Sequence, residues 1–163
     1  MNRVVVTGIG IISCIGNTKE EVLDSLKNLK SGITSAPEYK DYSFRSMVHG
    51  KPEIDLAENI DRKILRFMGD GAAYNYISMK EAINDSGLSE NDISNENTGI
   101  IVGSGGPSTQ NFLNAYEIAK SKGSKKVGPY MVTRTMSSTN TATLATPFKI
   151  KGVNYSISSA CST

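Results

Sequence analysis

The chain has 163 residues, of which 38% are hydrophobic and 21% charged, a balance typical of one globular domain or one half of a larger fold. Its formal charge of +2 is too small to indicate a nucleic-acid partner, and no apolar run approaches the roughly 18 residues that a membrane span needs. Two cysteines and a single histidine, His49, predict neither a disulfide framework nor a metal site, and an N-terminus without a cleavage site predicts a cytoplasmic protein.

The N-terminal part of the chain predicts a strand followed by a helix. Residues 3–7 are typical of a buried strand, and the glycine-punctuated turn over 8–16 holds Cys14 among isoleucines, as a core residue. Thr18-Lys19-Glu20-Glu21 matches a capping box, and apolar residues then recur on one helical face until Gly32. This is the first predicted β-α unit.

The next part lacks a sustained hydrophobic period. Residues 33–70 carry prolines and several charges, so we expect an irregular excursion over the surface, with His49 exposed or locally bonded. The basic segment 62–66 leads into a longer helix that ends at Gly87. Nearly all-round apolarity in the first half of that helix predicts that it is buried.

The C-terminal half alternates strands with helices, which predicts an α/β fold with a largely parallel sheet. Its expected elements are a fully buried strand over 98–103, a glycine-rich loop over 104–107, a helix around 112–118, a basic linker over 120–126, a short helix capped within 137–140 and continuing to Leu144, and a half-buried strand over 153–157.

The closing stretch presents a cysteine just past the last strand. Small residues at 158–160 allow a tight turn there, and a strand, a turn and then a thiol is an arrangement that can present a nucleophile. A helix beginning at Cys161 would favour its thiolate. The residues alone leave the alternative open that Cys161 is a small buried hydrophobe, because free cysteine is among the most buried residue types.

Two glycine motifs are candidates for ligand-binding loops. Thr7-Gly8-Ile9-Gly10 follows a strand, but Ser13 replaces the third glycine of a dinucleotide-binding loop and no acidic residue ends a second strand, so a structural turn is favoured. Gly103-Ser104-Gly105-Gly106 is neither a phosphate-binding loop nor a nucleophile elbow. It leaves open a close approach of its backbone to a ligand or helix.

Basic residues gather at two places that are far apart in the sequence, one at 45–66 and one at 120–126. A solvated surface is the default interpretation of each. If the fold brings them together, they would form a docking patch for an acidic partner.

Several stretches in this order make the chain resemble a known family. They are Thr7-Gly8-Ile9-Gly10, Asp61-Arg62-Lys63 with Arg66-Phe67-Met68, Gly103-Ser104-Gly105-Gly106, Gly128-Pro129-Tyr130 and the segment from Ala145 to Cys161. Together they resemble the N-terminal part of the β-ketoacyl-acyl carrier protein synthases, the condensing enzymes of bacterial fatty-acid synthesis.

The resemblance implies a thiolase-like fold of two similar halves stacked as α-β-α-β-α layers, with a mostly parallel mixed sheet. Residues 1–163 would form the N-terminal half-domain, and a C-terminal half would be missing. The resemblance also implies a homodimer in which the strand around Asn154–Ser158 pairs with its twin.

The resemblance assigns roles to particular residues. Cys161 takes the place of the acyl-accepting nucleophile. Gly106 matches the small gating residue of the acyl pocket in type I synthases, where type II synthases carry a bulky aliphatic residue, and Met136 matches a residue that closes the partner's pocket. The positions that face the acidic acyl carrier protein are Arg45, Arg62, Lys63, Arg66, Lys122 and Lys125.

The implied reaction is ping-pong, without a cofactor or metal: the cysteine accepts an acyl group, and malonyl-acyl carrier protein then loses carbon dioxide and attacks that group. The supporting histidines and lysine belong to the second half of the family sequence, so we expect residues 1–163 to be inactive alone. The alternatives are a type II or related condensing enzyme and, in another class, a non-catalytic carrier-binding or oligomerisation module.

Overall fold

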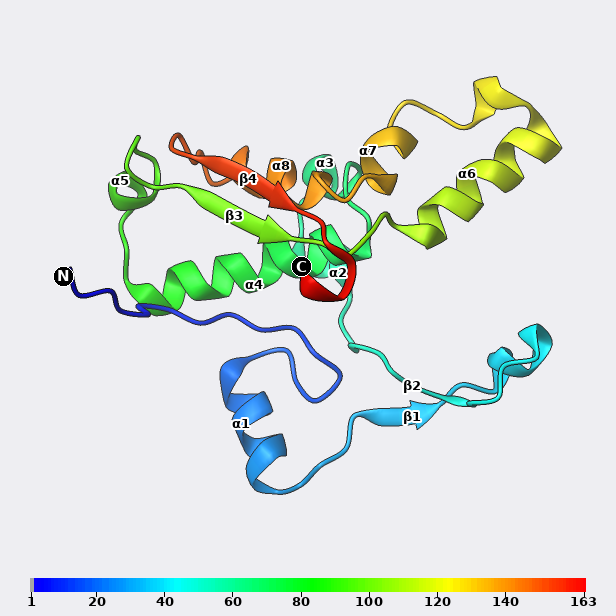
Figure 1. Cartoon of the computed structure of the whole chain (residues 1–163), viewed down its shortest axis with the longest axis horizontal. Coiled ribbons are helices and arrows are strands. Elements are labelled where there is room, and N and C mark those ends of the chain that lie inside the picture. The colour runs from blue at the N-terminus through cyan, green and yellow to red at the C-terminus, as the bar shows by residue number, and fades with distance from the viewer. Residues whose placement is uncertain (1) are drawn as a thin grey trace.

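The computed structural model describes residues 2–163 (Figure 1). Its helices are α1 (Lys19–Lys27), α2 (Leu56–Asn59), α3 (Arg62–Leu65), α4 (Asp70–Ser86), α5 (Glu90–Ile93), α6 (Thr109–Lys122), α7 (Met131–Thr135) and α8 (Thr139–Ala145). Its strands are β1 (Ile33–Ser35), β2 (Val48–Gly50), β3 (Ile100–Gly103) and β4 (Asn154–Ile157), and its 3-10 turns are η1 (Pro37–Tyr42), η2 (Ser124–Lys126) and η3 (Ala160–Ser162). No helix among these residues combines the length and apolarity needed to cross a membrane.

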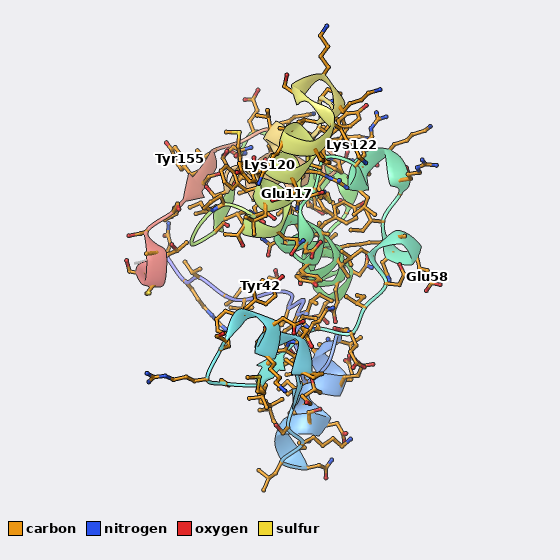
Figure 2. All side chains as sticks on the ribbon, turned by 90° about the vertical axis from the view of Figure 1, so that its right-hand side faces the viewer. Tyr42, Glu58, Glu117, Lys120, Lys122 and Tyr155 are labelled. Carbon is orange, nitrogen blue, oxygen red and sulfur yellow. The ribbon has the colours of Figure 1, made fainter. Side chains whose placement is uncertain are left out.

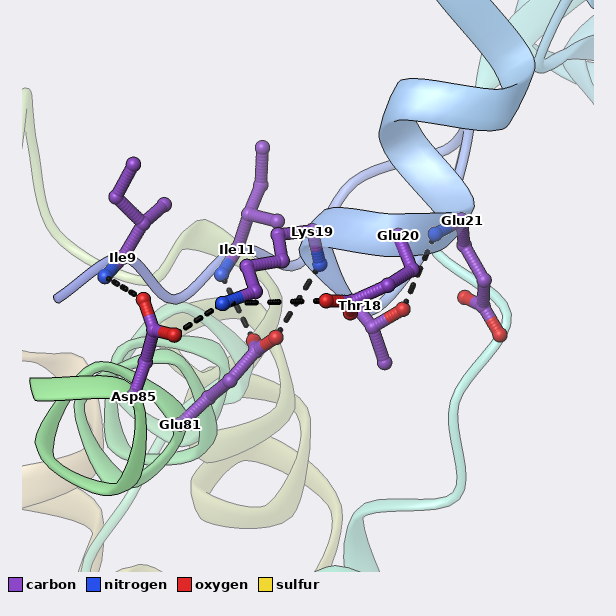
Figure 3. Close-up of polar contacts among 8 residues, drawn as sticks. All are labelled: Ile9, Ile11, Thr18, Lys19, Glu20, Glu21, Glu81 and Asp85. Atoms are coloured by element: carbon purple, nitrogen blue, oxygen red, sulfur yellow. Dashed lines mark hydrogen bonds and ion pairs between the residues drawn. The ribbon is translucent and has the colours of Figure 1, made fainter. Parts of the chain in front are cut away.

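The first segment of the chain is extended but unpaired, so the predicted buried strand over 3–7 is wrong. Val4 is 90% exposed, and no ladder joins residues 2–12 to another strand. The segment instead runs along α4, where the backbone N–H of Ile9 donates to the Asp85 carboxylate at 3.0 Å and that of Ile11 to Glu81 at 3.0 Å (Figure 3). Side-chain carboxylates thus take hydrogen bonds that a neighbouring strand would otherwise take.

The glycines of this segment allow the close approach to α4. A Cβ atom at Gly10 would lie 1.7 Å from the Ser78 carbonyl oxygen, and one at Gly8 would lie 2.1 Å from the Ala82 oxygen. Such contacts exclude any side chain. The glycines therefore have a structural role, as the sequence favoured over dinucleotide binding.

The predicted helix start at Thr18 is confirmed. The Thr18 hydroxyl accepts the Glu21 N–H at 3.2 Å, whereas the Glu21 carboxylate accepts from Asn17, one residue before the cap, at 2.7 Å. The Ser25 hydroxyl donates to the Ile15 carbonyl at 2.6 Å and ties α1 to the preceding turn. The helix ends at Lys27, earlier than the predicted stop near Gly32.

Residues 33–50 form a short antiparallel hairpin, in which Ile33 pairs with Gly50 and Ser35 with Val48, and η1 lies between the strands. His49 is locally bonded, as expected: its Nδ1 lies 3.4 Å from the Tyr39 hydroxyl. Cys14 is only half-buried, with its Sγ close to Gly32 and Gly50.

The expected irregular excursion over 33–70 differs from the structure at its C-terminal end. Residues 56–65 form α2 and α3, and Ile60 and Met68 are each only 3% exposed. The helices are only four residues long, too short to show a hydrophobic period in the sequence. This part of the chain therefore belongs to the core.

The core is centred on α4. Ile60 and Met68 pack with Ala72 and Ala73 of α4, and partly buried apolar side chains surround them. The long buried helix predicted before Gly87 is present, but Gly69 at its N-cap separates it from α3. Gly87 ends it with a left-handed backbone (φ 68°), as its residue type predicts.

The parallel sheet consists of β3 and β4, with Ile100 opposite Asn154 and Gly103 opposite Ile157. Both strands occur where they were predicted, and α8 packs against both and against α4 (Figure 1). Their burial differs from the prediction of a fully buried strand over 98–103 and a half-buried strand over 153–157. Ile101 is 66% exposed and all four residues of β4 are exposed, because α8 covers one side only. The observed architecture is α/β with a parallel strand pair.

Candidate active site

The thiol of Cys161 lies on η3, the tight turn that follows β4. Within residues 2–163, Cys161 is exposed and free. The turn places the thiol next to the end of the parallel sheet, because the Ser104 N–H after β3 donates to the Ile157 carbonyl at the end of β4 at 3.0 Å. The carboxyl ends of parallel strands are common places for ligand sites.

Small polar residues hold the turn itself. The Ser159 N–H donates to the Thr163 hydroxyl at 2.6 Å, the Ser159 and Ser162 hydroxyls lie 2.9 Å apart, and the Ser162 N–H donates to the Ser159 carbonyl at 3.0 Å. Ala160 has a left-handed backbone (φ 46°), which costs energy for a residue other than glycine. The predicted tight turn is therefore present, and it carries local strain beside the thiol.

The glycine-rich loop after β3 lies against this turn (Figure 1). A Cβ atom at Gly103 would meet the Thr163 side chain at 2.8 Å, and one at Gly105 would lie 3.2 Å from the Ala160 carbonyl oxygen. The close backbone approach that the sequence left open is thus made to the cysteine turn.

Gly106 and Met136, which the sequence analysis placed at an acyl pocket, line one open hollow with a volume of about 270 Å³. A Cβ atom at Gly106 would meet no atom within 4 Å, so a side chain there would enter open space. The other lining residues are Gly69, Gly71, Ala72, Ser104, Pro107, Ser108, Thr109, Gln110, Arg134, Thr139 and Asn140. Cys161 is not among them, although Ser104 and Gly106 belong to the loop beside its turn.

Three of the six basic residues that the resemblance assigns to carrier docking lie together around α3. Arg62 and Lys63 lie on α3 and Arg66 at its C-cap. The Arg66 guanidinium lies 5.0 Å from the centre of the Phe67 ring and 5.2 Å from that of Tyr130, which precedes α7. These contacts join α3 to the segment that follows η2.

The remaining basic residues lie on separate elements. Lys122 ends α6, Lys125 lies on η2, and Arg45 lies between η1 and β2. Figure 2 shows α6 with Lys122 above and the hairpin segment with Tyr42 below, both facing the viewer. Lys122 and the hairpin segment around Tyr42 thus share a side of the molecule but lie at different ends of it.

No sequence pattern indicates several of the residues that position the site. Thr141 of α8 is 1% exposed, and its hydroxyl forms a hydrogen bond with the hydroxyl of Ser156 on β4. On the same helix, Asn140 accepts a hydrogen bond from Asn75 of α4 at 2.9 Å. A buried threonine or asparagine on a short helix has no sequence signal of its own, because its role depends on elements far away in the chain.

No group of three or more His, Cys, Asp or Glu side chains that could hold a metal ion occurs within residues 2–163. The site geometry therefore consists of one exposed thiol, a glycine loop and a polar hollow.

Comparison with known proteins places this geometry in context. Residues 1–163 match the model of the family described as "Beta-ketoacyl synthase, N-terminal domain". The chain is 55% identical to 3-oxoacyl-[acyl-carrier-protein] synthase 1 of Haemophilus influenzae and 51% identical to that of Escherichia coli K12. It is covered completely in both alignments but spans only 40% and 41% of the two relatives.

Solved structures agree on the fold. An ishigamide ketosynthase/chain length factor superposes with a TM-score of 0.82 at 22% identity, covering 94% of this chain and 39% of the other. A ketosynthase solved with its acyl-carrier protein, AntDE:AntF, superposes with a TM-score of 0.71 at 21% identity, covering 94% and 40%. The shared fold is that of a ketosynthase N-terminal part.

Proposed function

The chain belongs to the β-ketoacyl synthase family, and from this premise we propose that it carries the acyl-accepting part of a 3-oxoacyl-acyl carrier protein synthase of type 1. The observation that carries the proposal is the exposed thiol of Cys161 on a strained turn, with a glycine loop beside it. The parent enzyme would elongate fatty acids by decarboxylative condensation.

The first half-reaction uses this thiol. The Cys161 sulfur, as thiolate, attacks the carbonyl carbon of an acyl thioester on the carrier protein, and the bond from that carbon to the carrier sulfur breaks. The products are an acyl-cysteine and the carrier thiolate, which takes a proton. Backbone N–H groups at the turn, including that of Cys161, would stabilise the oxyanion formed in between.

The second half-reaction needs groups beyond this thiol. Malonyl-carrier protein loses carbon dioxide, and the carbanion left on the malonyl carbon attacks the acyl-cysteine, which releases the Cys161 thiolate and forms a 3-oxoacyl product. The single histidine of this sequence, His49, is held near Tyr39 on the hairpin. We therefore expect residues 1–163 by themselves to form no condensation product.

The hollow at Gly106 and Met136 is proposed to receive part of the acyl chain. The open space at Gly106 supports this role, since a bulky side chain there would project into the hollow. It also supports type 1 over type 2, the alternative within the family.

Carrier docking is proposed for the basic side chains on α3, α6 and η2, together with Arg45. The AntDE:AntF structure, whose title describes an acyl-carrier protein bound to its ketosynthase, is consistent with such a partner. Arg66 is already oriented by its two aromatic neighbours, so it loses less side-chain entropy on binding than a freely rotating cation. Charge complementarity would mainly accelerate association.

Dimerisation is proposed through β4. In residues 2–163 this strand pairs only with β3, and the side chains of Tyr155 and Ile157 are 62% and 46% exposed. An unpaired edge with apolar side chains is a template for a second strand. A twin copy of the segment 154–158 would cover it.

A test of the chemistry is the mass of the whole parent enzyme after exposure to acyl carrier protein that is loaded with an acyl group. We expect one acyl group per chain, located at Cys161 by peptide mapping, and none in a Cys161→Ser variant. Cys14→Ser is the matched control because its thiol is half-buried between two glycines, and it should acylate normally. Acylation that persists in Cys161→Ser would refute the assignment.

The second candidate function is a carrier-binding or oligomerisation module without chemistry. The exposed cations and the open edge of β4 are the observations that favour it. The two functions are distinguished in the whole parent protein. Loss of carrier binding in an Arg62→Glu, Lys63→Glu variant, together with a Cys161 that is not acylated there, supports only the module.

A further inference from the structure

The side chain of Thr163 closes the turn that carries the candidate nucleophile. Its hydroxyl accepts a hydrogen bond from the Ser159 N–H at 2.6 Å. Ser159 lies two residues before Cys161 and Thr163 lies two residues after it, so this bond spans the cysteine. The exposed thiol therefore projects from a segment whose two ends are joined by one side-chain hydroxyl.

The methyl group of the same side chain lies against the end of β3. A Cβ atom at Gly103, the last residue of β3, would approach the Thr163 Cγ2 atom to 2.8 Å, and its three nearest neighbours would all be Thr163 atoms. Figure 1 shows the turn, drawn in red, beside this end of β3. Thr163 thus connects the cysteine turn to β3 by its methyl group and to the exit of β4 by its hydroxyl.

The hydrogen bond from Ser159 has no substitute in the turn. Within residues 2–163 the Ser159 N–H has no acceptor other than the Thr163 hydroxyl. The Ser159 carbonyl, by contrast, accepts twice from Ser162, from its N–H at 3.0 Å and from its hydroxyl at 2.9 Å. Loss of the Ser162 hydroxyl would leave the backbone bond in place, whereas loss of the Thr163 hydroxyl leaves the Ser159 N–H unpaired.

The turn needs such a support because its backbone is strained. Ala160, directly before the cysteine, has a left-handed backbone (φ 46°), and a residue other than glycine keeps that conformation only when its surroundings hold it. The Thr163 N–H donates to the Ala160 carbonyl at 3.3 Å, and the backbone of Gly105 lies against that carbonyl. Release of Thr163 would let Ala160 relax, and the thiol would move with it.

We propose that Thr163 is a positioning residue for acyl transfer to Cys161, and that its hydroxyl holds the thiol in the orientation from which it attacks a thioester. The inference rests on the proposed function, since it concerns the step in which the Cys161 sulfur bonds to the carbonyl carbon and the carrier sulfur leaves. Such an attack requires a defined approach of the two atoms, so a small displacement of the sulfur slows it.

The test measures acyl-cysteine formation at Cys161 in the whole parent enzyme, by peptide mapping over a range of concentrations of acyl-loaded carrier protein. Thr163→Val keeps the shape of the side chain and removes its hydroxyl. We expect the maximal rate of acylation to fall about three- to tenfold. The carrier concentration that gives half of that rate should stay the same, because the basic residues proposed for docking lie on other elements. Thr163→Ser keeps the hydroxyl and should stay within about twofold of the unaltered enzyme.

A second pair of variants tests the contact with β3. Gly103→Ala places a methyl group where the Thr163 Cγ2 atom lies, which should displace the turn and slow acylation to a similar extent. Thr163→Ser removes the Cγ2 atom and keeps the hydroxyl, so the double variant should regain the rate of Thr163→Ser alone. Recovery through a second substitution reports a coupling between the two residues and not a general loss of stability.

Two controls separate orientation from other effects. Thr98→Val removes a hydroxyl that donates to the Asp92 carbonyl at 2.6 Å, before the opposite end of β3, and should leave the rate unchanged. Alkylation of Cys161 by iodoacetamide, a small reagent that needs no docked carrier, should change by less than about twofold in Thr163→Val. Thr163 is itself exposed, so its substitution leaves the apolar core intact.

Three outcomes contradict the inference. Normal acylation in Thr163→Val, or a slow Gly103→Ala enzyme that Thr163→Ser does not restore, would overturn it and leave the proposed function standing. An equal fall of acylation and alkylation would overturn it too, because the hydroxyl would then act on the reactivity of the thiol and not on its orientation. Absence of acylation at Cys161 in the unaltered enzyme would refute the proposed function, and this inference with it.

Discussion

Two regions of the molecule are held together by different forces. The C-terminal region, residues 54–163, has an apolar core in which α2, α3, α4 and α8 enclose Ile60, Met68, Ala73 and Leu144. In the N-terminal region, residues 2–53, only Ala36 and Ser25 are buried. Burial of apolar surface is the largest favourable contribution to folding, so the two regions should differ widely in stability.

Polar contacts attach the N-terminal region to α4 (Figure 3). Glu81 accepts from the N–H groups of Ile11 and Lys19, and Asp85 accepts from Ile9 and from the Lys19 ammonium. These carboxylates and the glycine contacts at 8 and 10 make up a clamp, the name used below for Gly8, Gly10, Lys19, Glu81 and Asp85. The site residues of the C-terminal region therefore do not depend on the N-terminal region for their core.

The largest expected effect is in the apolar core. Met68→Ala removes a side chain that is 3% exposed and leaves a cavity, so we expect a loss of about 2–4 kcal/mol in the free energy of unfolding. Leu29→Ala, at a side chain 91% exposed in the N-terminal region, should change it by less than about 0.5 kcal/mol. Denaturant melts of both variants measure the difference, and similar losses would contradict a core confined to the C-terminal region.

The next effect concerns the clamp. Gly10→Ala places a methyl group where the Ser78 carbonyl oxygen leaves no room, which should displace the segment from α4 at a cost of about 1–3 kcal/mol. Gly106→Ala, into open space, is the matched control. Hydrogen exchange should accelerate over residues 2–17 and stay slow within α4. Unchanged exchange over 2–17 would show that the segment is not packed as described.

A smaller effect on stability is expected when the Asp85 carboxylate of the clamp is protonated. The Lys19 ammonium and then the Ile9 N–H hold the pKa of Asp85 below its ordinary value, and Asp85 in turn raises the pKa of Lys19, beside which Glu20 and Glu81 also lie. The contribution of Asp85 is therefore complete above the carboxyl pKa of the unfolded chain, about 3.9, and is lost as pH falls through the lowered folded value.

Amide hydrogen exchange over residues 2–17, measured as a function of pH and corrected for intrinsic exchange rates, reports the loss of the Asp85 contribution. Asp85→Asn should remove the acid transition of the segment. Asp24→Asn is the control, because the pKa of Asp24 is likewise lowered, by Lys30, but within α1 and away from the clamp. An acid transition that survives in Asp85→Asn would assign it to another group.

The sequence predicted those features that local chemistry determines. The α1 cap at Thr18, the end of α4 at Gly87 and both parallel strands occur at their predicted places because capping, left-handed glycine and alternation act within a few residues. The small residues before Cys161 likewise predicted its turn. Each of these signals lies next to the element that it specifies.

Features that depend on distant contacts could not be predicted. Residues 3–7 have the composition of a strand, but their hydrogen bonds go to carboxylates on α4, some 70 residues later. Arg134 lies between two threonines without a distinctive pattern, and only the fold brings its carbonyl oxygen against Gly69 at the start of α4. The roles proposed for Cys161, Gly106 and Met136 rest on the family resemblance, because no local pattern distinguishes an acyl pocket from a loop.

The smallest expected effect concerns a motif that occurs in both regions, a left-handed residue that follows a helix. A left-handed residue other than glycine follows each of α1 and α8: Leu29 (φ 53°) lies two residues after α1, and Lys149 (φ 53°) closes the turns that follow α8. In each case the following N–H bonds back five residues, from Lys30 to Ser25 at 2.8 Å and from Ile150 to Ala145 at 2.9 Å. Glycine is the preferred residue at such a helix end because it has no Cβ to clash.

Lys149→Gly should therefore raise the free energy of unfolding by about 0.5–1 kcal/mol, since α8 belongs to the C-terminal core. Leu29→Gly relieves the same backbone strain. The gain in stability should appear only as slower amide hydrogen exchange within α1, because α1 unfolds locally without the C-terminal core. Lys149→Gln separates strain from charge: it removes the ion pair with exposed Glu90 and keeps the backbone cost, so it should bring no gain. Equal global stabilisation by both glycine variants would mean that the two regions unfold as one unit.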